Sequence, residues 1–117
     1  MISRLEWVAG RYLLAILFAA AALQKAINPG AGQSLLAGFG LFEWLVWPAL
    51  VFNALAAGLL ISGKFLRPLG WALSLYCIAT SAFHFVPTDP WQMSIFVKNW
   101  ALAGGCLFLS AASVTRR

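Results

Sequence analysis

Charged side chains are too sparse in this 117-residue chain to cover the surface of a soluble domain. Only 9% of its residues are charged and 62% are hydrophobic, whereas soluble domains carry about 25% charged residues. The mean hydropathy is +0.86. This composition argues against a soluble enzyme, a disordered tail and a nucleic-acid-binding module, and it is typical of an integral membrane protein.

Four apolar runs follow one another along the chain, at residues 7–27, 41–62, 69–86 and 95–114. A membrane-spanning helix takes about 20 residues, so four fit this length with short connections and a fifth does not fit comfortably. The sequence therefore predicts one integral membrane domain over residues 1–117, an all-α membrane protein folded as a four-transmembrane-helix bundle. The glycine-rich stretch 30–40 is predicted to be a loop or a short helix lying in the membrane interface.

The basic residues predict which ends of the spans face the cytoplasm. With four spans, both termini and the turn at 63–68 lie on one side. That side collects six of the eight basic residues: Arg4, Arg11, Lys64, Arg67, Arg116 and Arg117. The positive-inside rule then places the N- and C-termini in the cytoplasm. The first run also has features of a signal peptide, but the even number of spans favours an uncleaved anchor.

Small residues at helical spacing predict close contacts between helices, because association in lipid depends on close backbone approach. They are Ala15, Ala19, Ala22 and Ala26 in the first run, Ala54 and Gly58 in the second, and Ala101, Gly104 and Gly105 in the fourth. We interpret these residues as packing positions only.

Apart from the six basic residues that predict the orientation, most polar side chains gather at the predicted non-cytoplasmic ends of the spans. The candidate ligand-binding residues are Gln24, Lys25, Asn53, His84, Lys98 and Asn99. Such groups tend to face a bundle interior, where they find partners. An imidazole can transfer a proton near neutral pH, and ammonium and amide groups can bind an oxygen. The set predicts a site for an apolar ligand with an oxygen-bearing head, such as a quinone; a lipid headgroup or an acidic loop of a partner protein would suit it equally.

Each candidate also has a purely structural interpretation. Lys25 and Lys98 could extend to the lipid headgroups, and Asn99 could cap or bridge helices. His84 alone would more often be a hydrogen-bonded interior residue. The two cysteines, at positions 77 and 106, have no metal-ligand or C-x-x-C spacing and are predicted to be buried, inert thiols. No metal site, catalytic residue or intrinsic cofactor is therefore predicted.

Several short motifs occur in a specific order. Gly10-Arg11 precedes the run that ends at Gln24-Lys25, Gly63 and Arg67 mark the turn after the second run, and Phe83-His84 precedes the sequence Phe-Val-Lys-Asn-Trp-Ala-Leu-Ala-Gly-Gly at 96–105. Over nearly the whole chain, this order resembles the DoxX family of small four-helix bacterial membrane proteins, which carry an F-H pair followed by F-x-K-N-L-A-L-x-G-G. Asn53 stands where many relatives have an acidic residue, and Trp100 where leucine is more usual.

The resemblance implies a subunit of a redox-linked complex, with quinone as its candidate ligand, in the bacterial inner (plasma) membrane. Family members include the membrane subunit of a thiosulfate:quinone oxidoreductase and a component of a complex that handles thiol stress. The expected partners are membrane lipids and a protein carrying the redox cofactor. Whether the chain forms a homo-oligomer is left open, and the chain is not expected to be an enzyme on its own.

Three alternatives stand beside this expectation. The first is a structural or assembly subunit of a larger membrane complex, without a ligand site. The second, less favoured, is a small-molecule transporter. Four-helix multidrug exporters depend on an acidic residue inside the first helix, where this chain has only Gln24 and Lys25 near the end. The third is a disulfide-exchanging enzyme, against which the missing C-x-x-C argues.

Overall fold

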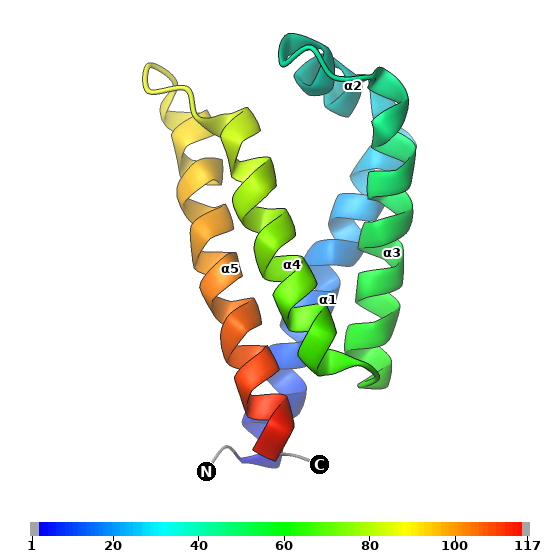
Figure 1. Ribbon diagram of the computed structural model, residues 1–117, viewed down its shortest axis with the longest axis vertical. Helices are drawn as coiled ribbons and strands as arrows, with labels where there is room; N and C mark the ends of the chain where they lie inside the picture. Colours follow the sequence, from blue (N-terminus) through cyan, green and yellow to red (C-terminus); the bar gives the residue numbers. More distant parts are fainter. Residues whose placement is uncertain (1–2, 116–117) are drawn as a thin grey trace. The chain divides into compact units, whose positions relative to one another are not determined.

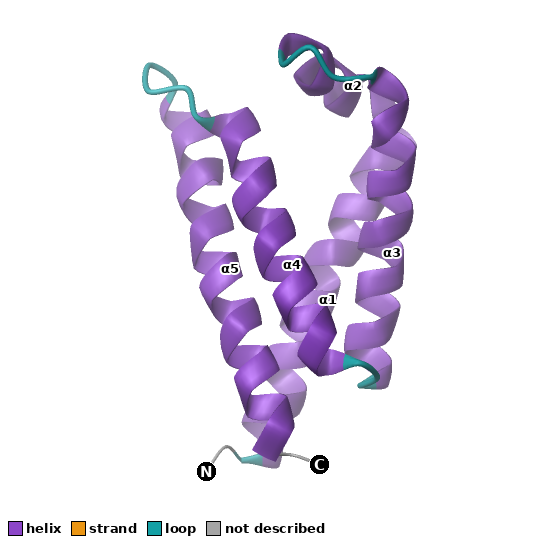
Figure 2. Ribbon diagram, viewed as in Figure 1, coloured by secondary structure: helices purple, strands orange, loops and turns teal. Residues whose placement is uncertain are grey.

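The computed structural model describes residues 3–115 of the chain, and its regular structure over these residues is helical (Figures 1 and 2). The elements in chain order are α1 (Arg4–Ile27), α2 (Pro29–Gly38), the 3₁₀ turn η1 (Glu43–Leu45), α3 (Val46–Ser62), α4 (Leu66–Ser81), the 3₁₀ turn η2 (Ala82–His84) and α5 (Pro90–Thr115). They form two compact units, Met1–Lys64 and Phe65–Arg117. The predicted all-helical class is confirmed.

Three helical stretches are long and apolar enough to cross a membrane: Arg4–Ile27, Glu43–Ser62 and Pro90–Val114. They agree with the first, second and fourth predicted spans. The third predicted span corresponds to α4, which has 16 residues and is shorter than the roughly 20 residues of a typical span. η2 continues its path to His84. Three candidate spans favour a membrane protein, and the crossing of α4 stays a prediction.

In the first unit α1 and α3 run antiparallel, and α2 lies at the end where they are joined (Figure 1). α1 begins with a capping box: the Ser3 hydroxyl accepts from the Glu6 N–H at 3.1 Å, and the Glu6 carboxylate accepts from the Ser3 N–H at 3.2 Å. α3 begins at Val46, which places Pro48 in its first turn, where proline is tolerated. The stretch predicted as a loop or a short helix is α2.

At the opposite end of this unit, Arg11 joins α1 to α3. Its Nε donates to the Leu60 carbonyl at 2.9 Å, and its Nη2 donates to the Ile61 carbonyl at 2.6 Å. These carbonyls belong to the last turn of α3, where backbone acceptors lack a partner within the helix and a positive charge is favourable. Arg11 was predicted only as a topology signal, and the structure adds a bond between two helices.

In the second unit α4 and α5 form an antiparallel hairpin (Figure 2), and the two helices lie in close contact at Gly70. A Cβ placed on Gly70 would lie 2.6 Å from the Cys106 carbonyl oxygen and 2.7 Å from the Ser110 Cβ. The Ser110 hydroxyl donates to the Arg67 carbonyl at 2.9 Å. A glycine in α4 therefore lets the two backbones meet.

The small residues did not predict this contact. A Cβ on Gly58, Gly104 or Gly105 would meet no described atom within 4 Å, so the close approach predicted at these glycines is absent from both hairpins. The reason is helix rotation: a small residue permits contact only when its side faces the partner helix. Cys77 and Cys106 are free and buried, which confirms their predicted burial.

Candidate functional site

The first unit brings two of the predicted site residues into contact. The Lys25 Nζ, in the last turn of α1, donates to the Asn53 Oδ1 at 2.9 Å. Asn53 is 1% exposed and Lys25 is half-buried. The contact forms because α1 and α3 are antiparallel, so the end of α1 lies beside the first half of α3. The interpretation in which Lys25 only extends to the headgroups does not account for this bond.

The partner of the Lys25 ammonium is a neutral amide rather than a carboxylate. The chain has three acidic residues, and over residues 3–115 none of them pairs with Lys25. Glu6 is bonded to Ser3, Glu43 is exposed, and Asp89 accepts from the N–H groups at the start of α5. A charge that is partly withdrawn from water and has no counter-charge favours a further oxygen acceptor. The Lys25–Asn53 pair is thus suited to bind an anionic or carbonyl oxygen.

In the second unit His84 contacts Gln92, a residue that the sequence analysis did not single out. The His84 Nδ1 lies 2.7 Å from the Gln92 Oε1. A carbonyl oxygen can only accept, so a hydrogen bond in this contact places the hydrogen on Nδ1. The contact therefore engages Nδ1, and Nε2 takes no part in it.

The position of Gln92 follows from the short connection between η2 and α5. Pro90 begins α5, and the Asp89 carboxylate accepts from the Trp91 and Gln92 N–H groups at 3.0 and 3.4 Å, as an N-cap does. The first turn of α5 is thereby held beside η2. The sequence signal that could have found Gln92 is its place in the first helical turn after Asp89-Pro90, one short loop beyond His84.

The other three candidates differ in exposure. Gln24 and Lys98 are exposed, and Asn99 is 8% exposed on α5. Within the described chain their side chains form no hydrogen bond to one another. The structure therefore places Lys25 with Asn53 and His84 with Gln92, and a joint site of all six predicted residues stays a prediction. Over the same residues, no three His, Cys, Asp or Glu side chains gather as a metal site.

Comparison with protein-family models, curated proteins and solved structures found no match to this chain. Its function must therefore be inferred from the two polar contacts and from the apolar helices that carry them.

Breaking the Lys25–Asn53 contact from either side is expected to lower the free energy of unfolding by about 1–3 kcal/mol, because each single change removes the charge-assisted hydrogen bond between a half-buried ammonium and a buried amide. We expect Lys25→Met and Asn53→Leu to be destabilising alone, and the double variant to lose less than their sum. Thermal unfolding in detergent micelles measures these effects. Lys98→Met, at an exposed lysine, is the control with little change, and strictly additive losses would contradict the coupling.

Proposed function

We propose that the chain is an integral membrane subunit of a redox-linked complex, with a polar site that binds the oxygen-bearing head of an apolar ligand such as a quinone. The Lys25–Asn53 contact carries this proposal. It puts a half-buried ammonium and a buried amide between two helices that are each apolar enough to span a membrane. Ionisable groups in such helices are costly, and they typically mark ligand or proton pathways.

The proposed setting is the bacterial inner membrane, with four spans and with both termini in the cytoplasm. α4 together with η2 would form the third span along the chain, and the basic residues near the termini and at 63–68 support this orientation. The Lys25 end of α1 would then face the non-cytoplasmic side. The resemblance of residues 83–84 and 96–105 to the DoxX motifs supports a redox-linked complex.

The chain's own residues would supply binding and proton chemistry, and a partner protein with its own cofactor would supply electrons. The Lys25 ammonium and the Asn53 amide can hold a ligand oxygen. His84, oriented by Gln92 through Nδ1, can accept a proton from a ligand hydroxyl at Nε2. A quinone suits the Lys25–Asn53 pair, because its oxygens act as hydrogen-bond acceptors in the oxidised form.

A second candidate function is a structural or assembly subunit without a ligand site. One observation favours it: each polar contact is made inside its own unit, Lys25 with Asn53 and His84 with Gln92. Polar side chains that bond between neighbouring helices also stabilise membrane proteins that bind nothing.

Gentle detergent extraction followed by mass spectrometry tests both candidates. We expect the wild-type chain to co-purify with a protein that carries a redox cofactor and with a bound quinone or a similar apolar molecule. Lys25→Met and Asn53→Leu should lose the bound molecule several-fold and keep the partner, while Lys64→Met, in the exposed turn, should keep both. Loss of the partner in both site variants would favour the assembly role. A homo-oligomer without a small molecule would contradict the redox subunit.

A further inference from the structure

The segment between α1 and α3 exposes an unusual run of large apolar side chains. α2 has no buried residue. The exposed side chains that follow it are Phe39 (54%), Leu41 (44%), Phe42 (70%), Trp44 (58%) and Trp47 (46%). The rings of Phe42 and Trp44 are stacked, with their centroids 6.2 Å apart. Exposed apolar surface of this kind marks a site of interaction with a membrane or a protein.

The position and charge of this segment favour a membrane as its partner. α1 and the stretch Glu43–Ser62 are both candidate spans, so the segment would lie where a membrane-spanning hairpin leaves the hydrocarbon. Between Ala26 and Trp47 the only charged residue is Glu43. Aromatic rings favour the level of the lipid headgroups, and a segment without lysine or arginine gains no attraction from anionic lipids.

α2 is also packed against its own unit. A Cβ on Gly32 would lie 2.9 Å from the Cγ2 of Val46, and Val46 is 1% exposed at the start of α3. The N–H groups of Phe39 and Gly40 donate to carbonyls in the last turn of α2, and Gly40 adopts a positive φ of 71° that closes the turn. Gly32 thus packs α2 against the start of α3, and the turn at Gly40 leads directly to the exposed Phe42 and Trp44.

We propose that α2, residues 39–42 and η1 form an interfacial anchor, which lies in the headgroup layer at the joined end of α1 and α3. Phe42 and Trp44 insert toward the acyl chains, and Glu43 between them faces water. The anchor binds zwitterionic lipid as well as anionic lipid, because it presents no basic side chain. It is independent of any ligand at Lys25.

Cysteine labelling in phosphatidylcholine vesicles tests the anchor. Phe42→Cys and Glu43→Cys are made one at a time, with native Cys77 and Cys106 buried in the second unit. We expect a water-soluble maleimide to label the cysteine at position 42 several-fold more slowly than that at 43, and to keep this ratio when anionic lipid is added. Equal labelling rates would overturn the proposal.

Fluorescence distinguishes lipid from a protein partner. In a variant whose only tryptophan is Trp44, lipids brominated near the headgroup should quench more strongly than lipids brominated near the chain ends. In the matched control, the single tryptophan is introduced by Leu55→Trp, at an exposed position in the middle of α3. There the lipids brominated near the chain ends should quench more strongly. Quenching of Trp44 by aqueous acrylamide but by neither lipid would overturn the proposal, as would shielding from all three quenchers, which indicates a protein contact.

Discussion

Replacing Gly70 by alanine is expected to lower the free energy of unfolding by about 1–3 kcal/mol, with a larger loss for valine. The added Cβ would sit 2.6 Å from the Cys106 carbonyl oxygen, close to the Cα of Ser110 as well. These are backbone atoms, so α4 and α5 must separate to make room. Separation also weakens the bond from the Ser110 hydroxyl to the Arg67 carbonyl. Thermal unfolding followed by circular dichroism in micelles measures the loss.

The sign of this effect separates packing from helix propensity. Alanine is favoured over glycine inside a helix by about 1 kcal/mol. The same substitution at a glycine that contacts no other helix should therefore raise the free energy of unfolding. Gly58→Ala and Gly104→Ala are the matched controls, because a Cβ on either meets no described atom within 4 Å. If Gly70→Ala were as stable as Gly104→Ala, the close approach of α4 and α5 would be refuted.

Replacing Arg11 by lysine is expected to lower the free energy of unfolding by about 2 kcal/mol, although the charge is kept. A hydrogen bond to a charged group contributes about 1.5–3 kcal/mol. The lysine ammonium cannot reproduce the two-pronged contact of Nε and Nη2 with the Leu60 and Ile61 carbonyls. Arg11→Met should cost at least as much. Thermal unfolding, together with hydrogen exchange at the end of α3, gives the measurement.

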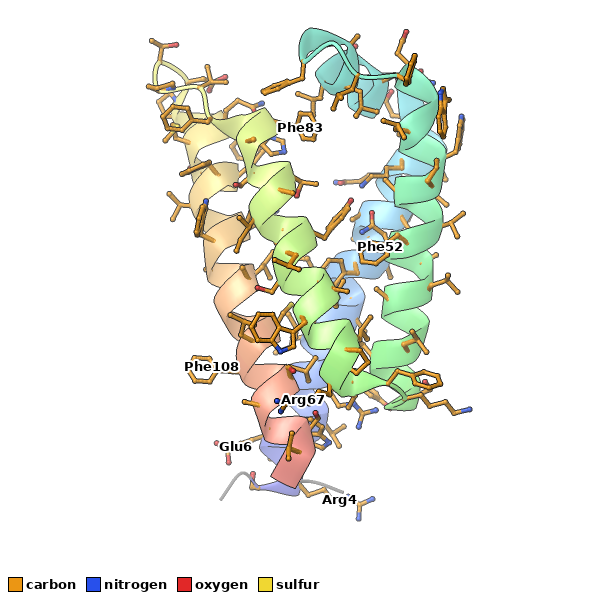
Figure 3. All side chains as sticks on the ribbon, in the orientation of Figure 1. Arg4, Glu6, Phe52, Arg67, Phe83 and Phe108 are labelled. Atoms are coloured by element: carbon orange, nitrogen blue, oxygen red, sulfur yellow. The ribbon has the colours of Figure 1, made fainter. Side chains whose placement is uncertain are left out.

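The lysine variant also distinguishes the two roles of Arg11. A topology signal depends on positive charge alone, so Arg11→Lys should keep the membrane orientation, as read by the accessibility of cysteines placed near the termini. Arg4→Lys, at an exposed position in the first turn of α1 (Figure 3), is the control that should change neither orientation nor stability. Wild-type stability in Arg11→Lys would show that the bond to α3 is dispensable.

The residues of the candidate site were predictable only in part. Lys25, Asn53 and His84 stand out in the sequence because polar groups are rare in apolar runs. The bond between Lys25 and Asn53 was not predictable, because it depends on how α1 and α3 are rotated and shifted against each other. Gln92 was missed because a polar residue in the first turn of a helix is ordinary unless its neighbour across the loop is known.

The sequence by itself determined the helical class and three apolar stretches long enough to span a membrane. These are local properties, set by hydropathy over consecutive residues and by backbone preference. Only the tertiary structure decided that Gly70, rather than Gly58 or Gly104, contacts a neighbouring helix. It also decided that Arg11 donates hydrogen bonds to the last turn of α3. The physical reason is rotation about the helix axis: spacing groups residues on one face, and packing alone decides which face meets a partner.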